Sequence, residues 1–212
     1  MEDGPRGIVL FGDVVDSRRG SEQSTAFLRA LRTELEDAYP EAARLAPIGL
    51  TQGDELQVLL APGADPFLAV LRAGLRLDAK PMRWAIVAGE VDPGTGPATE
   101  RTGRAFLEAR ERLERAKVAR RSLVAHTGDP RADGLLDDIG PVLPELLRDL
   151  TERQRDAARL LLVDGLRRAD VADCLGVSRA TVSVLADRAH VRELGGLEHG
   201  LAAIFRSGET AA

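Results

Sequence analysis

The sequence has few aromatic residues, a single cysteine and no long apolar run. Aromatic residues make up 3% of its 212 residues, whereas hydrophobic residues make up 44%, so a packed core has to consist mainly of Leu, Val and Ala. Cys174 has no second cysteine with which to form an internal disulfide. No apolar run approaches the roughly 20 residues of a membrane span. Because the N-terminus also lacks a signal-peptide pattern, we predict a cytoplasmic protein without a membrane partner.

Segments rich in basic residues are missing as well. The chain carries 34 acidic and 29 basic residues, which gives a net charge of −5. Residues 151–212 contain nine of each, so the first 150 residues hold 25 acids and 20 bases and carry the whole excess. This balance excludes a polybasic protein that binds nucleic acid through charge alone.

Apolar runs alternate with helical stripes over the first 128 residues. We expect strands at residues 7–13, 47–50, 56–60, 82–91 and 122–125, with helices at 21–38, 65–77 and about 102–117. The turn at 51–55 lies between two of these strands and contains Gly53 and Asp54, which favour a hairpin. This element order predicts an α+β fold of the ferredoxin-like type, in which helices cover one face of an antiparallel sheet.

The segment from His126 to Gly134 is polar and rich in turn residues, and it predicts a boundary between a domain at 1–128 and a helical domain at 135–212. An apolar stripe follows from Leu135 to Leu150, interrupted by two prolines. This stripe either packs on neighbouring helices or forms a contact between two copies of the chain. Thr151 and Gln154 then form a capping box that begins a helix reaching about residue 163.

Residues 168–189 fit the pattern of a helix-turn-helix. Gly176 suits the turn, Ala172 is small where the two helices cross, and Ser178 caps the second helix. The expected small core comprises Val171, Leu175, Val177, Val182 and Leu185. The exposed residues expected to contact duplex DNA are Ser178, Arg179, Thr181, Ser183 and Arg188. The alternative is a helical pair used for packing or for binding a protein. One neutral module binds DNA weakly, so a homodimer is expected.

Three segments carry a resemblance to known families. Phe11-Gly12-Asp13, the Gly53-Asp54 turn and the strand from Arg83 to Val91 together resemble the class III nucleotidyl cyclase domain. With Val14-Val15-Asp16-Ser17, Glu55-Leu56-Gln57 and residues 103–110, the chain is similar to the SatD family, which joins such a domain to a helix-turn-helix.

The resemblance implies a site for a divalent metal, Mg²⁺ or Mn²⁺, at the ends of neighbouring strands. Its ligands would be Asp13 and Asp54, with Asp16 and Glu55 close by, because a hard cation takes several oxygen ligands. The metal would in turn hold a nucleotide. The residues then expected to contact that nucleotide are Val14, Val15, Ser17 and Gly53.

The chain also departs from the cyclase pattern at three positions. Leu50 stands where cyclases carry a base-reading Lys, and Leu107 and Glu111 stand where they carry an Asn and an Arg that stabilise the transition state. We therefore expect a DNA-binding regulator whose first domain binds nucleotide or metal, or dimerises, and no cyclase activity. The alternatives are a metal-dependent nucleotidyl transferase localised by its helix-turn-helix, and a non-catalytic interaction protein.

Overall fold

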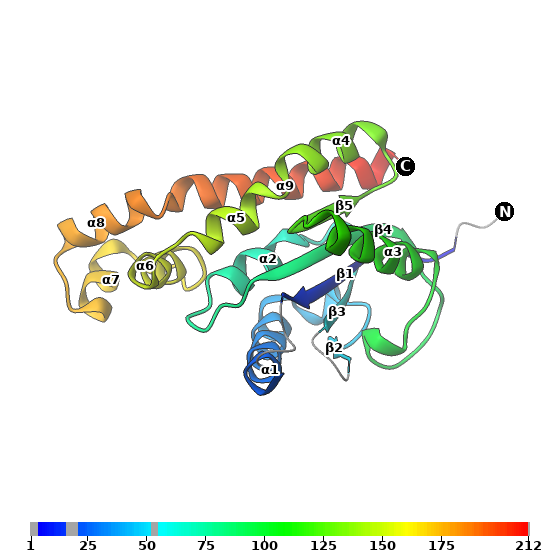
Figure 1. The fold of residues 1–212 in the computed structure, drawn as a ribbon, viewed down its shortest axis with the longest axis horizontal. Coiled ribbons are helices and arrows are strands. Elements are labelled where there is room, and N and C mark those ends of the chain that lie inside the picture. The colour runs from blue at the N-terminus through cyan, green and yellow to red at the C-terminus, as the bar shows by residue number, and fades with distance from the viewer. Residues whose placement is uncertain (1–3, 16–20, 52–54, 212) are drawn as a thin grey trace.

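The computed structural model of the protein describes residues 4–15, 21–51 and 55–211. In this part of the chain a five-stranded sheet is followed by a series of helices (Figure 1), which confirms the predicted α+β class. The strands are β1 (Arg6–Val14), β2 (Gly49–Leu50), β3 (Glu55–Leu60), β4 (Met82–Glu90) and β5 (Leu123–His126). The helices are α1 (Ser21–Ala38), α2 (Phe67–Gly74), α3 (Arg104–Ala119), α4 (Pro130–Ile139), α5 (Val142–Arg148), α6 (Glu152–Leu162), α7 (Arg168–Leu175), α8 (Arg179–Arg188) and α9 (Val191–Ala211). Short 3₁₀ helices lie at Glu41–Ala43 and Ala98–Glu100.

The strand order is β2-β3-β1-β4-β5, with β1 in the middle of the sheet. β1 pairs antiparallel with both β3 and β4, and β2 forms the expected hairpin with β3. The prediction of a wholly antiparallel sheet is wrong at one edge, because β5 runs parallel to β4, with Leu123 opposite Trp84. The cause is α3, which crosses the sheet between these strands and brings the chain back in the same direction.

Helices cover both faces of the sheet, whereas the sequence predicted cover on one. Side chains alternate along β1, so that Leu10 joins a core with Phe27 of α1, while Phe11 faces the opposite side. There the ring of Phe11 packs on Phe106 of α3, with 6.1 Å between the ring centroids. Cover on both faces explains why β1 is apolar at consecutive positions.

The predicted boundary segment at 126–134 is largely helical. α4 begins at Pro130, and the Asp129 side chain caps it by accepting hydrogen bonds from the backbone N–H groups of Arg131 and Ala132. The apolar stripe that follows is divided between α4 and α5 at Gly140–Pro141. Because Leu136, Leu143 and Leu147 are buried in the core, the stripe packs on its neighbours. A contact between two chains at its exposed edge stays a prediction.

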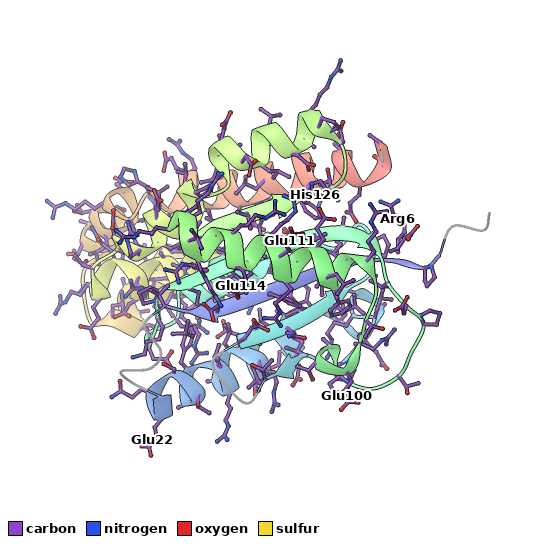
Figure 2. The ribbon with its side chains drawn as sticks, turned by 45° about the vertical axis from the view of Figure 1, so that its right-hand side comes forward. Arg6, Glu22, Glu100, Glu111, Glu114 and His126 are labelled. Carbon is purple, nitrogen blue, oxygen red and sulfur yellow. The ribbon has the colours of Figure 1, made fainter. Side chains whose placement is uncertain are left out.

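His126 connects three elements at the end of β5. Its Nδ1 lies 2.5 Å from Asp133 Oδ2 on α4, and its Nε2 lies 3.1 Å from Glu108 Oε1 on α3. Figure 2 shows the ring between these two helices. The imidazole therefore links β5 to the helices on either side of it.

The last helix, α9, runs back along α4 to the sheet (Figure 1). Its Phe205 packs edge-on against Phe67 of α2, with 6.0 Å between the ring centroids. At Gly208 a Cβ atom would overlap Thr127 and Ala132, so only glycine allows this close approach. Phe205 belongs to the same apolar core as Ile8 of β1, and this core therefore extends across both predicted domains. The division at 128–135 stays a prediction.

Candidate functional site

The helix-turn-helix is formed by α7 and α8, with α6 packed against both. Gly176 ends α7 in the left-handed conformation, at φ 62° and ψ 36°, where a side chain would be strained. The Ser178 hydroxyl caps α8 by accepting a hydrogen bond from Thr181 N at 3.1 Å. Both residues therefore occupy the positions that the sequence predicted for them.

A small apolar core holds this unit together, separate from the core of the sheet. It is built on Val171, Ala172 and Val182, with side chains from α6 around them. Leu175 and Val177 pack against it as expected, whereas Leu185 is only half-buried and lies outside it. The unit therefore has an apolar core of its own, and the residues of α8 that face away from this core are exposed.

Of the residues predicted to contact DNA, Thr181 and Arg188 share one side of α8, whereas Arg179 and Ser183 lie on the other side of the helix. Arg179, Thr181 and Arg188 are exposed, while Ser183 is half-buried. The hydroxyls of Ser178 and Thr181 lie 2.9 Å apart and bond each other within the cap, so they are already engaged. The two arginines are accordingly the strongest candidates for base or phosphate contacts.

Two further residues of this surface were missed from the sequence. Arg168, the first residue of α7, donates a hydrogen bond to Ser183 Oγ at 3.5 Å and so reaches the α8 surface. Val184 is 48% exposed and lies three residues after Thr181 and four before Arg188, on the same side of the helix. Its i+3 spacing from Thr181 was the signal that could have identified it.

Four acids, Asp13, Asp16, Asp54 and Glu55, were predicted to hold a metal, and the structure describes two of them. Asp13 of β1 lies directly opposite Glu55 of β3, and both are buried. Asp16 and Asp54 lie outside the described residues. Asp13 and Glu55 thus lie close together, as predicted. Whether they can bind a metal depends on the side chains with which they already form ion pairs.

Glu55 forms an ion pair with Arg110 of α3. Both guanidinium Nη atoms reach its carboxylate, Nη2 at 2.7 Å from Oε1, and Gln57 Nε2 donates to the same oxygen at 2.7 Å. The Arg110 guanidinium also stacks over the Phe11 ring, 4.5 Å from its centroid. Arg110 follows Phe106 by one helical turn, so the apolar stripe of α3 already indicated that it faces the sheet.

Asp13 is also paired with cations. Its carboxylate lies 3.5 Å from Lys117 Nζ and 4.0 Å from Arg83 Nη1. Burial lowers the pKa of Lys117, but a hydrogen bond to Glu114 and the charge of Asp13 outweigh this and raise that pKa overall. Lys117 therefore stays protonated near neutral pH and keeps Asp13 compensated.

These two acids do not suit a metal site as they stand. A dication needs carboxylates that are free to coordinate it, whereas Asp13 and Glu55 are each neutralised by a basic side chain. Among the residues the structure describes, no group of three or more His, Cys, Asp or Glu side chains is arranged to hold a metal ion. The metal site stays a prediction that depends on Asp16 and Asp54.

We expect Mn²⁺ to raise the melting temperature of the protein at neutral pH only if Asp16 and Asp54 supply ligands that release Asp13 from Lys117. The ion would have to displace Lys117 from Asp13 and Arg110 from Glu55, and the loss of those pairs opposes binding. Thermal unfolding with and without Mn²⁺, for wild type and Asp13→Asn, measures this. A rise in wild type that Asp13→Asn abolishes would establish the metal site and favour the nucleotidyl transferase alternative.

Of the three positions that depart from the cyclase pattern, the two on α3 lie away from these acids, whereas Leu50 lies opposite Leu56, the residue after Glu55. Leu107 is 76% exposed, and Glu111 points outward from α3 (Figure 2), where it pairs with Arg115. Leu50 is half-buried in β2. Neither α3 position therefore faces Asp13 or Glu55.

Of the residues expected to contact a nucleotide, two are described. Val14 is 3% exposed and packs in the core of the sheet, whereas Val15 is half-buried and lines a cavity. Ser17 and Gly53 lie outside the described residues. The structure therefore brings one of the four predicted residues to a cavity.

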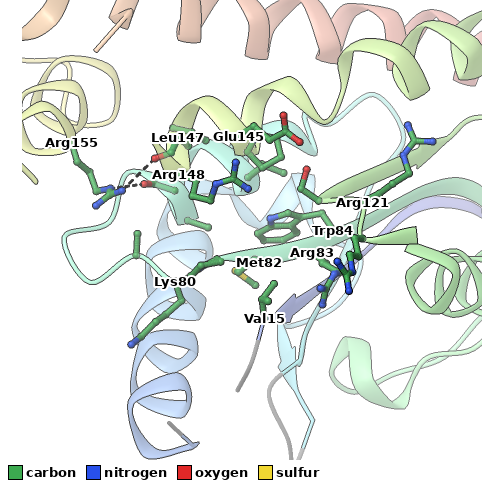
Figure 3. A pocket seen from close by; sticks show the side chains of 18 residues that line it. Val15, Lys80, Met82, Arg83, Trp84, Arg121, Glu145, Leu147, Arg148 and Arg155 are labelled. Atoms are coloured by element: carbon green, nitrogen blue, oxygen red, sulfur yellow. Dashed lines mark hydrogen bonds between the residues drawn. The ribbon is translucent and has the colours of Figure 1, made fainter. Parts of the chain in front are cut away.

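This cavity has a volume of about 430 Å³ and lies where β1 ends and β4 begins (Figure 3). Met82 and Trp84 of β4 form part of its wall, and Leu147 of α5 faces them. Its lining contains one acidic residue, Glu145, and six basic ones: Lys80, Arg83, Arg120, Arg121, Arg148 and Arg155. The cavity is therefore strongly basic in a chain whose net charge is −5.

No protein-family model matches the chain, and no curated protein sequence matches it either. The described residues contain no helix that is both long enough and apolar enough to cross a membrane.

Proposed function

We propose that the protein is a cytoplasmic transcriptional regulator that binds duplex DNA with α8 as its recognition helix. The observation that carries this proposal is the unit formed by α6, α7 and α8, with its glycine turn, its capped second helix and its own apolar core. A unit of this kind holds α8 rigidly and leaves its outer side free to enter a major groove.

The exposed residues of α8 have the chemistry that base recognition requires. Arg179 at its beginning suits the two acceptors on the major-groove edge of guanine. Thr181, Val184 and Arg188 follow on one side, and the exposed Val184 suits the methyl group of thymine. Asp170, at the beginning of α7, is paired with Arg167 at 3.1 Å, which reduces its repulsion of DNA phosphates.

The zero net charge of residues 151–212 favours DNA binding by a homodimer over binding by a single copy. Residues 151–212 carry nine acids and nine bases, so one copy gains little from counterion release. Two copies on half-sites about one helical turn apart gain affinity and specificity together. Leu135 of α4 and Val142 of α5 are 52% and 40% exposed, and they offer an apolar surface on which two copies can pair.

The ion pairs of Asp13 and Glu55 support a regulatory role for the sheet in place of a catalytic one. Arg110 and Lys117 compensate acids that a nucleotidyl transferase needs for its metal. The resemblance to the SatD family agrees with a cyclase-like domain joined to a DNA-binding unit. In this proposal the sheet domain binds an effector or pairs two copies, and α8 reads the DNA.

We expect Arg179→Ala to weaken binding to a selected DNA site by about 1–3 kcal/mol, the usual loss for an arginine that pairs with guanine. The site is selected from a pool of random duplexes, and binding is then measured by fluorescence anisotropy at fixed salt. Arg192→Ala is the matched control, because Arg192 lies just beyond α8 and its side chain is 94% exposed. If no sequence is enriched, or if both variants bind as wild type does, α8 is not a recognition helix.

A further inference from the structure

The basic cavity between β4 and α5 has room and charge for a small ligand. Its volume of about 430 Å³ is within the range of small-molecule sites. Apolar side chains, including Trp84, and several basic residues line it (Figure 3). Sites with this combination of apolar wall and a few charged groups fix the orientation of an organic ligand through the charges.

The basic side chains of the cavity differ in how far they are already engaged. Arg155 donates to the backbone carbonyls of Gly74, at 3.0 Å, and of Leu147 and Leu150, at 3.3 Å each. Its charge thus holds α6 to the ends of α2 and α5, and Arg121 is similarly bound to Asp137. These two arginines have structural partners.

Two other arginines keep charge available for a ligand. Arg120 is exposed and forms no ion pair with any described residue. Arg148 lies 3.5 Å from the exposed Asp149, and pairs of this kind are weak in water. The Arg83 side chain, by contrast, points to the opposite face of the sheet from Met82 and Trp84, where it lies 4.0 Å from Asp13.

From this geometry we infer that the cavity binds a small organic anion with at least two negative charges, held by Arg120 and Arg148. Guanidinium groups bind phosphate and carboxylate oxygens in the same bidentate way, so the shared chemistry is a doubly charged oxyanion group. Trp84 and Met82 contact the apolar part of the ligand. A bound anion would neutralise both arginines.

The ligand would also join two parts of the fold. Arg120 follows α3, which packs on the sheet, whereas Arg148 ends α5, shortly before α6 and the helix-turn-helix. Binding therefore stabilises α5 against the sheet and raises the melting temperature of the whole chain.

Trp84 is the single tryptophan of the chain, so its fluorescence reports on the cavity directly. The probes are AMP, citrate and inorganic pyrophosphate, with neutral adenosine as the uncharged comparison. We expect a saturable change in Trp84 fluorescence and a rise in melting temperature with at least one of the anions. AMP or pyrophosphate alone would assign phosphate, and citrate alone would assign carboxylate. Adenosine should give neither response.

The test variant is Arg120→Gln with Arg148→Gln, and we expect it to bind the active anion at least tenfold more weakly. Both residues are exposed, so the variant should fold, and far-ultraviolet circular dichroism checks that it does. Arg115→Gln is the matched control, because its side chain on α3 is 63% exposed and outside the cavity. The inference fails if no anion gives a saturable response, if adenosine matches AMP, or if the double variant binds as tightly as the control.

Discussion

Glu34→Gln should lower the free energy of unfolding by about 3 kcal/mol, because it removes the carboxylate that three half-buried arginines share. The Glu34 side chain is 11% exposed and accepts hydrogen bonds from Arg76 Nη1 at 2.8 Å and Arg159 Nη1 at 3.0 Å. Arg72 Nη1 lies 3.6 Å away. One carboxylate on α1 thus compensates arginines from α2 and from α6.

Chemical denaturation of wild type and Glu34→Gln measures this loss. Glu36→Gln is the matched control on the same helix, because Glu36 forms only a partly exposed pair with Arg32 at 3.9 Å and should cost less than about 1 kcal/mol. Equal losses in the two variants would contradict the central role of Glu34. A double-mutant cycle with Arg159→Gln isolates the link between α1 and α6.

Local patterns in the sequence were sufficient to predict most elements of the fold. The apolar run of β1 and the 51–55 turn predicted the middle strand and the hairpin, because side-chain periodicity and turn chemistry act over a few neighbouring residues. The helix-turn-helix was predicted for the same reason, since Gly176 and Ser178 determine its geometry locally.

Long-range packing could not be predicted in this way. The pairing of β5 with β4 depends on the strand beside which α3 returns the chain, and the return of α9 depends on contacts such as Phe205 with Phe67. Leu201 and Phe205 have a helical spacing, which indicates an apolar side of α9 but does not identify the surface that it covers.

The charged groups of the site were the least predictable part. Arg110 and Glu55 are 55 residues apart, and Arg159 and Glu34 are 125 apart. Asp13 and Glu55 therefore looked like free metal ligands, because nothing near them in the sequence indicates their basic partners. Glu198 of α9 also has a partner distant in the sequence, the acid Asp65 before α2, in addition to its neighbour His199, whose Nδ1 lies 2.9 Å from Glu198 Oε2.

Glu198 is 2% exposed, and its carboxyl group bonds the side chain of Asp65. Asp65 also accepts a hydrogen bond from Phe67 N at 2.9 Å and so caps the beginning of α2. Burial is the main cause that raises the pKa of Glu198 to about 8, and the hydrogen bond and charge of Asp65 add to it, while Arg206 opposes it. Near pH 7 this carboxyl group is therefore mainly protonated and donates to Asp65.

The raised pKa makes the docking of α9 dependent on pH. The folded protein keeps a proton on Glu198 that the unfolded chain, with its ordinary carboxyl pKa, releases. The resulting stabilisation is fully present below about pH 4.5 and is lost as the pH rises through about 8. The loss amounts to at most about 5 kcal/mol, because a tenfold change in an acid dissociation constant corresponds to about 1.4 kcal/mol.

We expect the free energy of unfolding to fall steadily between pH 5 and pH 9, and Glu198→Gln to reduce that slope, since a glutamine amide can still donate to Asp65 but does not titrate. Denaturation at a series of pH values measures this. Glu209, whose pKa burial also raises, contributes a slope of the same sign that remains in the variant. Glu193→Gln is the matched control on α9, because the pKa of Glu193 is lowered by a backbone hydrogen bond and by Arg192, so it does not titrate in this range. If Glu198→Gln keeps the wild-type slope, the proton that holds α9 against α2 is not on Glu198.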